Sequence, residues 1–525
     1  MFFFFQPTSG FKLVELDLKY HKILGTNTFN FVSDKDDPSS IYSTVLIGPN
    51  GTGKSEILKL LLKLFRNIFV MTEDNSPEFI DGYFNLIYTV NGVKYEYSNF
   101  TGNPEPYRDL GSGKLKNAKH YLKREDVFVS NMKPDQNLPN AIIANSIMLT
   151  DKYFVPRNKK EQDAFPMYKY LGVRNRPQQA STRSYVRKTV EFVVQQIDSP
   201  KFKSGLKKIT EFLGFSNNID IEYRTINTPK FFSGNISKQY LDVYFEEIEG
   251  RYKKLEKIAP FKVSHYFKYR KNPNFIDELC SYVNDISRNE KWDKIYRSSS
   301  KILRFNILND VSKKELKANY KYLDALREIG VVSPPEIKFG QSNINIKESS
   351  SGEFHFFSTM VGLMATVKEN SLILIDEPEI SLHPNWQMKY LHFIRVLLSD
   401  KIFRSCHIII ATHSHFLVSD LEGSSSKIIG LKKESGVIGT IDIDKNTYGW
   451  SAEQVLLDVF EVSTSRNYYI AERLGELMDF IANPDNSLKE IKNKYEDLGL
   501  DKIDSLSELD PLNDVLKRIR KKYVV

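Results

Sequence analysis

Three short segments of this 525-residue sequence carry side chains whose types and spacing suit phosphate chemistry. The first, residues 48–55, reads GPNGTGKS and matches the pattern GxxxxGK(S/T) between an apolar run and a helical pattern. In such a P-loop, backbone N–H groups point at phosphate oxygens, Lys54 neutralises their charge and the Ser55 hydroxyl binds Mg²⁺. A glycine turn without function is the alternative, which the flanking strand and helix disfavour. The predicted nucleotide-binding set is Gly48, Asn50, Gly51, Thr52, Gly53, Lys54 and Ser55.

The second segment, residues 372–377, is the continuous apolar run LILI followed by two carboxylates. This pattern is typical of a parallel strand buried on both faces, with its acidic residues at the carboxyl edge of the sheet. There Asp376 would hold Mg²⁺, largely through water, and Glu377 would act as the general base on the attacking water. Two solvated carboxylates are the alternative, and the upstream P-loop favours the catalytic pair.

The third segment is another apolar run, residues 407–411, which ends in Thr412, His413 and Ser414. Because parallel strands end at one edge, His413 would stand beside Glu377, where a histidine can hydrogen-bond the γ-phosphate and the catalytic water. A lone histidine is more often structural, but three strand ends that converge on one edge favour a functional one. The predicted catalytic residues are therefore Lys54, Glu377 and His413.

Residues 349–353, SSSGE, precede a long apolar helical stretch. Ser350 and the first N–H groups of that helix would bind a γ-phosphate, aided by the helix dipole. An ordinary helix cap with a Ser/Glu capping pattern is the alternative. The segment resembles the signature motif of ABC-type ATPases in its LSSGE form, and this resemblance adds Ser350 and Gly352 to the predicted binding set.

The ABC resemblance implies how the site is completed. In that architecture the signature lies too far from the P-loop of its own subunit to touch the same nucleotide. Two subunits would therefore sandwich two ATP molecules with their Mg²⁺, and residues 381–384, SLHP, would be the D-loop that crosses the interface. A homodimer is the smallest assembly implied, and a higher oligomer of dimers stays open.

Other segments narrow the resemblance. Lys54 and Ser350 are 296 positions apart, far more than in a transporter-type ATPase. DEPEISLHPNWQ at 376–387, followed by ATHSHFL at 411–417, resembles the OLD-like, AAA_21-type branch of repair-related ABC ATPases. A clear Q-loop glutamine is missing after residues 141–144, where Asn145 or Ser146 could take its place. Such an ATPase implies an α/β fold of the P-loop NTPase, ABC-ATPase type.

Flanking segments are similar to stand-alone ATPases of the Septu PtuA type, including those beside retrons. They are residues 140–156, 168–174, 448–451 and 465–469. This resemblance implies a separate HNH nuclease as partner and regulation of that nuclease in anti-phage defence. It also makes nucleic acid and a retron reverse transcriptase with its DNA candidate partners.

Two rival functions stay open. A DNA-binding repair or recombination ATPase would act on DNA ends, and the long coiled coils that favour it are absent from the sequence pattern. An OLD-like ATPase with its own nuclease would need a Toprim module, for which Asp442 and Asp444 offer only a DxD string that an alternating solvent face explains better. No HNH pattern occurs in the sequence either.

The strands and helices that must position these residues are predicted to form an ATPase head in two halves, with a helical insertion between them. Residues 1–155 would form the first half with the P-loop, and 156–335 a mostly helical insertion. Residues 336–445 would form the second half with the signature, the acidic strand and His413, and 446–525 a C-terminal helical segment.

Strand patterns refine this prediction. Strand-like pieces between residues 78 and 150, among them 141–144, are expected to complete an antiparallel subdomain. Residues 427–431 and 437–443 are expected as further parallel strands.

Composition limits the remaining options. The content of 41% hydrophobic residues indicates a folded globular chain, and the net charge of +8 permits contact with nucleic acid. The only two cysteines, Cys280 and Cys406, lie far apart and form no CxxC pair, so neither a disulfide framework nor a cysteine-ligated zinc site is expected. This favours a reducing, cytoplasmic compartment. No run approaches the roughly 20 apolar residues that span a bilayer, so no membrane contact is expected.

Overall fold

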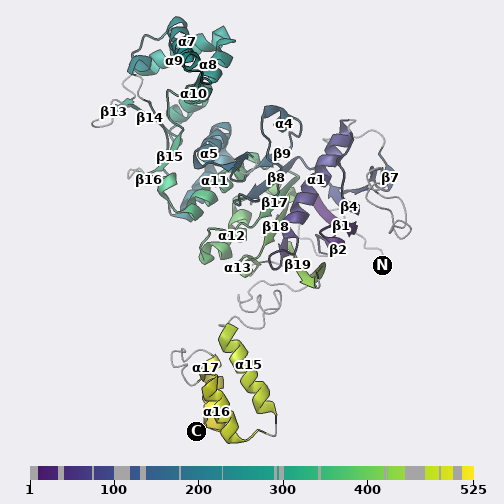
Figure 1. Cartoon of the computed structure of the whole chain (residues 1–525). Coiled ribbons are helices and arrows are strands. Elements are labelled where there is room, and N and C mark those ends of the chain that lie inside the picture. The colour runs from purple at the N-terminus through teal and green to yellow at the C-terminus, as the bar shows by residue number, and fades with distance from the viewer. Residues whose placement is uncertain are drawn as a thin grey trace. The chain divides into compact units, whose positions relative to one another are not determined.

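The chain forms two compact units, Met1–Tyr448 and Gly449–Val525, in a computed structural model (Figure 1). The structure describes residues 10–33, 41–73, 76–99, 119–129, 137–176, 179–226, 229–288, 292–294, 301–340, 344–418, 421, 424–434, 436–443, 468–483, 486–500 and 511–524.

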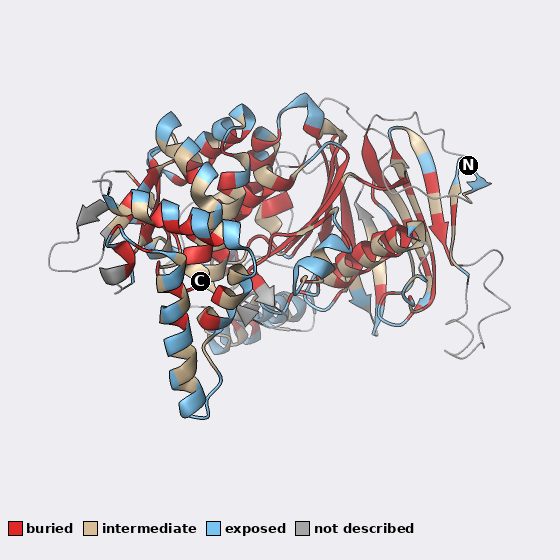
Figure 2. Ribbon diagram, turned by 90° about the horizontal axis from the view of Figure 1, so that it is seen from above, coloured by how far each residue is buried: buried red, intermediate tan, exposed pale blue. Residues whose placement is uncertain are grey.

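A seven-stranded sheet with the order β20-β19-β3-β18-β17-β8-β9 organises the larger unit. Its strands are β3 (Tyr42–Ile47), β8 (Ala141–Ser146), β9 (Tyr168–Tyr170), β17 (Ser371–Asp376), β18 (His407–Thr412), β19 (Ser426–Glu434) and β20 (Val437–Ile443). All neighbours from β19 to β9 run parallel. The four central strands β3, β18, β17 and β8 are buried along their whole length, as the red central strands of Figure 2 show, which explains their continuous apolar runs.

Two strands differ from the sequence prediction. Residues 141–144 lie in β8, which pairs parallel with β17, and are not part of the antiparallel subdomain. Their sequence, AIIA, is apolar toward both faces, as a central parallel strand requires. Residues 437–443 form β20, which runs antiparallel to β19. Only two residues separate these strands, too few for the crossover that a parallel pair needs.

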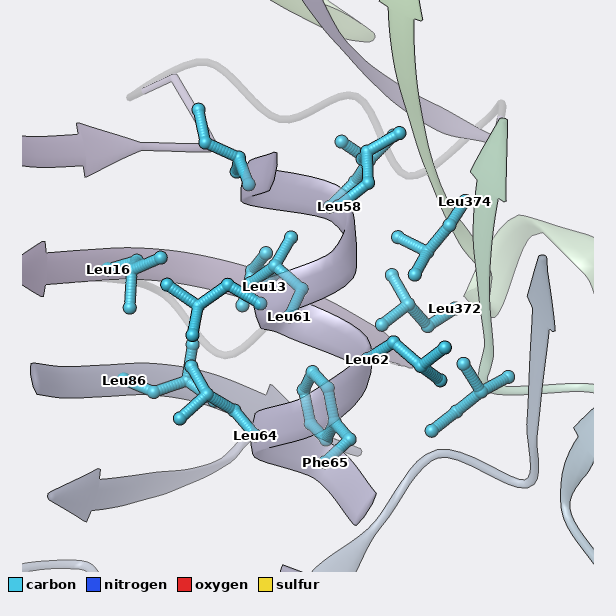
Figure 3. Packing of buried hydrophobic residues seen from close by; sticks show 14 of the residues in the cluster. Leu13, Leu16, Leu58, Leu61, Leu62, Leu64, Phe65, Leu86, Leu372 and Leu374 are labelled. Atoms are coloured by element: carbon cyan, nitrogen blue, oxygen red, sulfur yellow. The ribbon is translucent and has the colours of Figure 1, made fainter. Parts of the chain in front are cut away.

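An antiparallel sheet with the order β2-β1-β4-β5-β6-β7 forms a second layer of this unit. Its strands are β1 (Phe11–His21), β2 (Gly25–Asn30), β4 (Tyr83–Val90), β5 (Val93–Ser98), β6 (Tyr121–Arg124) and β7 (Val127–Phe128). Helix α1 (Lys54–Thr72) packs between the two sheets, and Figure 3 shows Leu62 beside Leu372 on one side and Leu61 beside Leu13 on the other. This burial on both sides holds the start of α1 in a fixed place relative to β17.

A helical layer packs around α11 (Ser351–Thr366), which α5 (Thr182–Gln196) and α6 (Pro200–Leu213) contact. Phe212 of α6 stacks against Phe356 of α11 and contacts Phe393 of α12 (Pro384–Leu397). Short helices α4 (Lys159–Asp163) and α13 (His415–Val418) complete the connections. Helices α6, α11 and α12 therefore pack in one layer.

The region expected as a helical insertion contains helices together with a sheet. Its remaining helices are α7 (Lys238–Lys254), α8 (Phe261–Arg270), α9 (Pro273–Arg288) and α10 (Asp310–Glu328), and a small hairpin joins β10 (Arg174–Arg176) to β11 (Gln179–Ala180). The sheet has the order β13-β14-β12-β15-β16, with β12 (Ile219–Arg224), β13 (Trp292–Lys294), β14 (Lys301–Asn306), β15 (Glu336–Phe339) and β16 (Ile344–Asn345). Strand β9 of the parallel sheet lies after residue 155, and strands β15 and β16 of the insertion sheet lie after residue 335. The head and the insertion therefore overlap at both of the predicted boundaries.

The smaller unit is helical in its described parts, with α15 (Tyr468–Ala482), α16 (Leu488–Asp497), α17 (Pro511–Ile519) and the final turn Arg520–Val524. Its core comprises Leu477, Tyr495, Leu500, Leu516 and Ile519. Across the described residues of both units, helices fall short of the length or the hydropathy needed to span a membrane.

Candidate functional site

The P-loop occupies the turn between a strand and a helix. Strand β3 ends before it and α1 begins at Lys54, so residues 48–53 form the connection. Gly51 and Gly53 adopt φ values of 82° and 89°, in the left-handed region that favours glycine. Asn50 and Gly51 lie exposed at the turn. The backbone therefore has the tight course predicted for a phosphate-binding loop.

Polar groups of the loop bind its own carbonyls. Lys54 Nζ donates to Gly48 O at 2.7 Å and to Pro49 O at 3.0 Å, and Thr52 Oγ1 donates to Pro49 O at 2.8 Å. A Cβ on Gly48 would lie 2.2 Å from Leu431 O, so only glycine fits there. Burial lowers the pKa of Lys54, and the three carboxylates of the neighbouring strand end oppose this shift. The ammonium group is thus already held at the loop.

A hydrogen bond joins α1 to the acidic strand, where Ser55 Oγ donates to Asp376 Oδ1 at 2.9 Å. Asp376 is buried at the end of β17, and this burial raises its pKa to about 7, while the Ser55 hydrogen bond opposes the rise and nearby Glu377 adds to it. Mg²⁺ prefers oxygen ligands and keeps several waters. The hydroxyl and the carboxylate therefore fit a Mg²⁺ site, because a cation would compensate the buried negative charge.

Glu377 turns the chain out of β17. Its φ of 47° lies in the left-handed region, which is strained for a residue with a side chain and is common at functional sites. Its N–H donates to Ala411 O at 2.8 Å, and its side chain is 15% exposed. His413 Nδ1 lies 3.7 Å from Glu377 Oε1, and the His413 side chain is 44% exposed. The predicted base and histidine therefore meet at one edge.

A third carboxylate at this edge, that of Glu379, is not among the residues predicted from the sequence. Glu379 is buried, and its Oε1 accepts from Thr412 Oγ1 at 2.7 Å and from His413 N at 2.8 Å. The only sequence signal was the extra acid of DEPE at residues 376–379, which without burial information looks like part of a polar turn.

The serine-glycine segment forms the start of α11. Ser350 Oγ accepts from Glu353 N at 3.2 Å and Ser350 N donates to Glu353 Oε2 at 2.7 Å, which is a capping box. Ser350 and Ser351 are exposed. A Cβ on Gly352 would lie 2.3 Å from Ser381 O, so this glycine lets the expected D-loop approach the helix. Within the described residues, no hydrogen bond links Ser350 or Gly352 to the P-loop of the same chain.

The two candidates for the Q-loop position make contacts inside the chain. Asn145 accepts from a threonine of α11 at 3.5 Å, and Ser146 Oγ accepts from the backbone N–H two residues later at 3.2 Å. The loop after β8 contributes Asp151, which accepts from Arg174 Nε at 2.8 Å and Tyr170 at 2.7 Å. Neither Asp151 nor its contact with Arg174 is predicted from the sequence.

Some predicted positions lie outside the described residues. They are residues 448–451 and 465–467, which carry part of the family resemblance, and Asp444. Asp442 belongs to β20, where its backbone pairs with Ile429.

Two sequence comparisons find relatives of this chain. The family model described as AAA ATPase domain, AAA_15, matches residues 30–418. The Septu protein PtuA of Bacillus thuringiensis is 29% identical over 107 residues, which are 20% of this chain and 26% of that protein. The chain thus aligns with about a quarter of that relative's length.

Solved structures of SMC head domains and of a recombination mediator protein are also similar. The Smc head domain of Pyrococcus furiosus is 12% identical, with 82% of this chain and 96% of that chain covered and a TM-score of 0.30. The SMC head domain of Thermotoga maritima is 11% identical, with coverage of 82% and 99% and a TM-score of 0.32. The recombination mediator protein RecF is 13% identical, with coverage of 83% and 99% and a TM-score of 0.30. The strand order of the parallel sheet and the geometry of the P-loop are those of an α/β P-loop fold of the ABC-ATPase type.

Proposed function

Because the chain belongs to the AAA ATPase domain family, AAA_15, we propose that it binds Mg²⁺-ATP at the carboxyl edge of its parallel sheet and hydrolyses it between two copies of the chain. The hydrogen bond of 2.9 Å between Ser55 Oγ and Asp376 Oδ1 carries this proposal, because it joins the P-loop helix to the acidic strand. Glu377 and His413 stand beside that bond at the same edge.

Nucleotide binding uses the P-loop. The start of α1 and the amides of residues 48–53 face the β- and γ-phosphates. The Lys54 ammonium exchanges its two carbonyl partners for phosphate oxygens, which satisfy a buried cation better. Ser55 and Asp376 hold Mg²⁺, which when bound neutralises phosphate charge.

Hydrolysis uses the two strand ends next to the loop. Glu377 takes a proton from the attacking water, whose oxygen forms a bond to the γ-phosphorus while the bond to the β,γ-bridging oxygen breaks. His413 hydrogen-bonds the γ-phosphate and the water. Inorganic phosphate and ADP leave, and Glu377 returns its proton to solvent.

A second copy of the chain completes each site. The exposed start of α11 supplies the γ-phosphate contact to the nucleotide of the partner copy. Because Ser350 Oγ accepts a bond from Glu353 N, its hydroxyl proton is available to a phosphate oxygen. Among the described residues, Ser350 has its hydrogen-bond partner in Glu353 and none in the P-loop of the same chain, which supports this head-to-tail arrangement.

We extend the proposal to the control of a partner HNH nuclease in anti-phage defence. It is supported by the likeness to the Septu protein PtuA, together with the Septu-type ATPases that the sequence resembles, which work with a separate nuclease. ATP clamps two heads together and hydrolysis releases them, so the nucleotide state sets the activity of the nuclease.

Phosphate release by the purified chain tests the proposal. The wild type should hydrolyse Mg²⁺-ATP, and Glu377→Gln should keep ATP binding but slow turnover by at least about 10²-fold, as loss of a general base does. The matched control is Glu369→Gln, an exposed carboxyl before the start of β17, which should keep the wild-type rate. Parental turnover in Glu377→Gln would refute the base assignment.

A nicking assay separates the rival functions. Plasmid DNA should be cut only when the HNH protein accompanies the chain. Metal-dependent nicking by this chain alone would favour a built-in nuclease. ATP-dependent binding of DNA ends without any nuclease partner would favour a repair ATPase.

A further inference from the structure

Glu379 lies at the catalytic edge but has no part in the chemistry described above. Its side chain is 4% exposed, and it follows the base Glu377 by two positions. Among the described residues, its buried Oε2 has no hydrogen-bond partner, so the contacts of Oε1 hold the carboxylate. A buried carboxylate needs such donors to remain ionised. These donors show where it acts.

Two donors converge on Glu379 Oε1, the Thr412 hydroxyl and the His413 backbone N–H, and the His413 ring lies beside them. Thr412 Oγ1 lies at 2.7 Å, His413 N at 2.8 Å and His413 Nδ1 at 3.1 Å. The competing carboxylate oxygen, Glu377 Oε1, is 3.7 Å from the same Nδ1, beyond hydrogen-bond length. The histidine is therefore bound to Glu379 through its backbone N–H, and its ring Nδ1 lies within ion-pair distance of the same oxygen.

This contact decides which ring nitrogen faces the reaction. A carboxylate accepts and does not donate, so its nearness to the ring favours the tautomer in which Nδ1 of His413 carries the proton. The tautomer of a histidine is set by the partner of its other nitrogen. Nε2, on the far side of the ring, is then the atom left for phosphate and water.

We propose that Glu379 is a positioning residue that holds His413 in the tautomer and orientation needed for hydrolysis. The inference rests on the proposed ATPase function of the same edge. It differs from the role of Glu377, because Glu379 acts through the histidine and not on the water.

A double-mutant cycle in phosphate release tests this role. Glu379→Gln keeps an oxygen for the donors but loses the charge, so kcat should fall by about tenfold, because charge-assisted bonds are about twice as strong as neutral ones. Glu379→Ala removes the anchor and should lower kcat by about 10²-fold. KM should change little in both, since the P-loop is untouched. In a His413→Ala background, Glu379→Gln should lower kcat by less than about twofold.

The background comparison decides the outcome. Equal losses with and without His413 would overturn the proposal, because Glu379 would then act independently of the ring. An unchanged rate in Glu379→Gln alongside wild-type hydrolysis would overturn it too. A wild type that binds Mg²⁺-ATP without hydrolysing it would instead overturn the proposed function. Glu369→Gln serves as the matched control and should keep the wild-type rate.

A spectroscopic readout covers variants that fold poorly or turn over too slowly. In protein with ¹⁵N-labelled histidine, assigned by loss of the signal in His413→Ala, the wild-type ring should show its proton on Nδ1. Glu379→Gln should shift that signal toward a mixture of tautomers. A ring protonated on Nε2 alone in the wild type would overturn the proposal.

Discussion

Burial shifts the pKa values of two charged side chains at the carboxyl edge of the parallel sheet in opposite directions. It lowers the pKa of the Lys54 ammonium and raises the pKa of the Asp376 carboxyl to about 7. Each group is therefore harder to charge than in water. Mg²⁺-ATP brings a polyanion to the lysine and a cation to the carboxylate, so we expect binding to favour the charged form of both.

Lys54→Ala should abolish ATP binding. The ammonium is the loop's own cation, and its neighbours at the edge are carboxylates that would repel the triphosphate once it is gone. A titration with a fluorescent ATP analogue measures the loss. Lys59→Ala is the matched control, since Lys59 lies on the same helix, half exposed, and pairs with Glu56 at 3.0 Å. Unchanged affinity in Lys54→Ala would place the nucleotide elsewhere.

The sequence predicted much of the site because its residues follow patterns that fix backbone position. GPNGTGKS and LILIDE each place their polar side chains at the end of an apolar strand, and the structure brings Ser55 and Asp376 into contact there. Glu379 could not be predicted in this way. Whether an acid after Pro378 points to solvent or into the edge depends on contacts with Thr412 and His413, which are distant in sequence.

At the level of elements, apolar runs predicted that strands exist but not how they pair. AIIA at residues 141–144 was recognised as a strand, yet only its neighbour β17 decides its direction. The insertion sheet was missed for a different reason. Its strand β12 reads IDIEYR, in which charged residues alternate with apolar ones, and its partners β14 and β15 lie far along the chain. Alternation of charged and apolar residues is typical of a strand with one buried face, but it does not show which other strand it pairs with.

A single buried histidine connects three strands of the head. His407 of β18 accepts from Leu13 N of β1 at 3.0 Å through Nδ1, and its Nε2 pairs with Thr44 Oγ1 of β3 at 2.8 Å. The ring is therefore neutral with its proton on Nε2. Burial lowers its pKa well below the ordinary value. Protonation of Nδ1 would break the hydrogen bond that His407 accepts from Leu13 of the antiparallel sheet.

The histidine makes the stability of the head depend on pH. The pKa of His407 in the folded protein is lower than its unfolded value of about 6.5. The contribution of this residue to the unfolding free energy is therefore complete above pH 6.5 and is lost as the pH falls below that value. We expect the unfolding free energy to drop by up to about 1.4 kcal/mol per pH unit below pH 6.5 from this residue. Urea unfolding between pH 5 and 8 measures the slope.

Two variants isolate that slope. His407→Gln can still accept a hydrogen bond but does not titrate, so it should flatten the pH dependence while lowering stability at pH 8. His392→Gln replaces an exposed histidine of α12 and should leave the slope unchanged. An identical slope in the wild type and His407→Gln would assign the acid sensitivity to other groups.

At the scale of the whole molecule, the start of α11 is the part of the proposed site that does not contact the nucleotide of its own chain. Its capping box satisfies the helix end within the chain, and Ser350 and Ser351 remain exposed. Gly352 keeps this helix end in close contact with the loop at Ser381. Two segments proposed to meet the partner copy are thus joined in one surface, so a partner would engage both together.

Ser350→Trp should spare ATP binding by the single chain and abolish cooperative hydrolysis, because the indole blocks the approach of the partner's phosphates. In a Glu377→Gln background, which keeps ATP bound, Mg²⁺-ATP should double the mass seen by light scattering, and Ser350→Trp should prevent the doubling. Ser487→Trp is the matched control, since Ser487 forms the same capping box with Glu490 at the start of α16. It loses a helix cap of equal kind but should still dimerise. Doubling that persists in Ser350→Trp would show that the copies meet through another surface, and the sandwich arrangement would have to be abandoned.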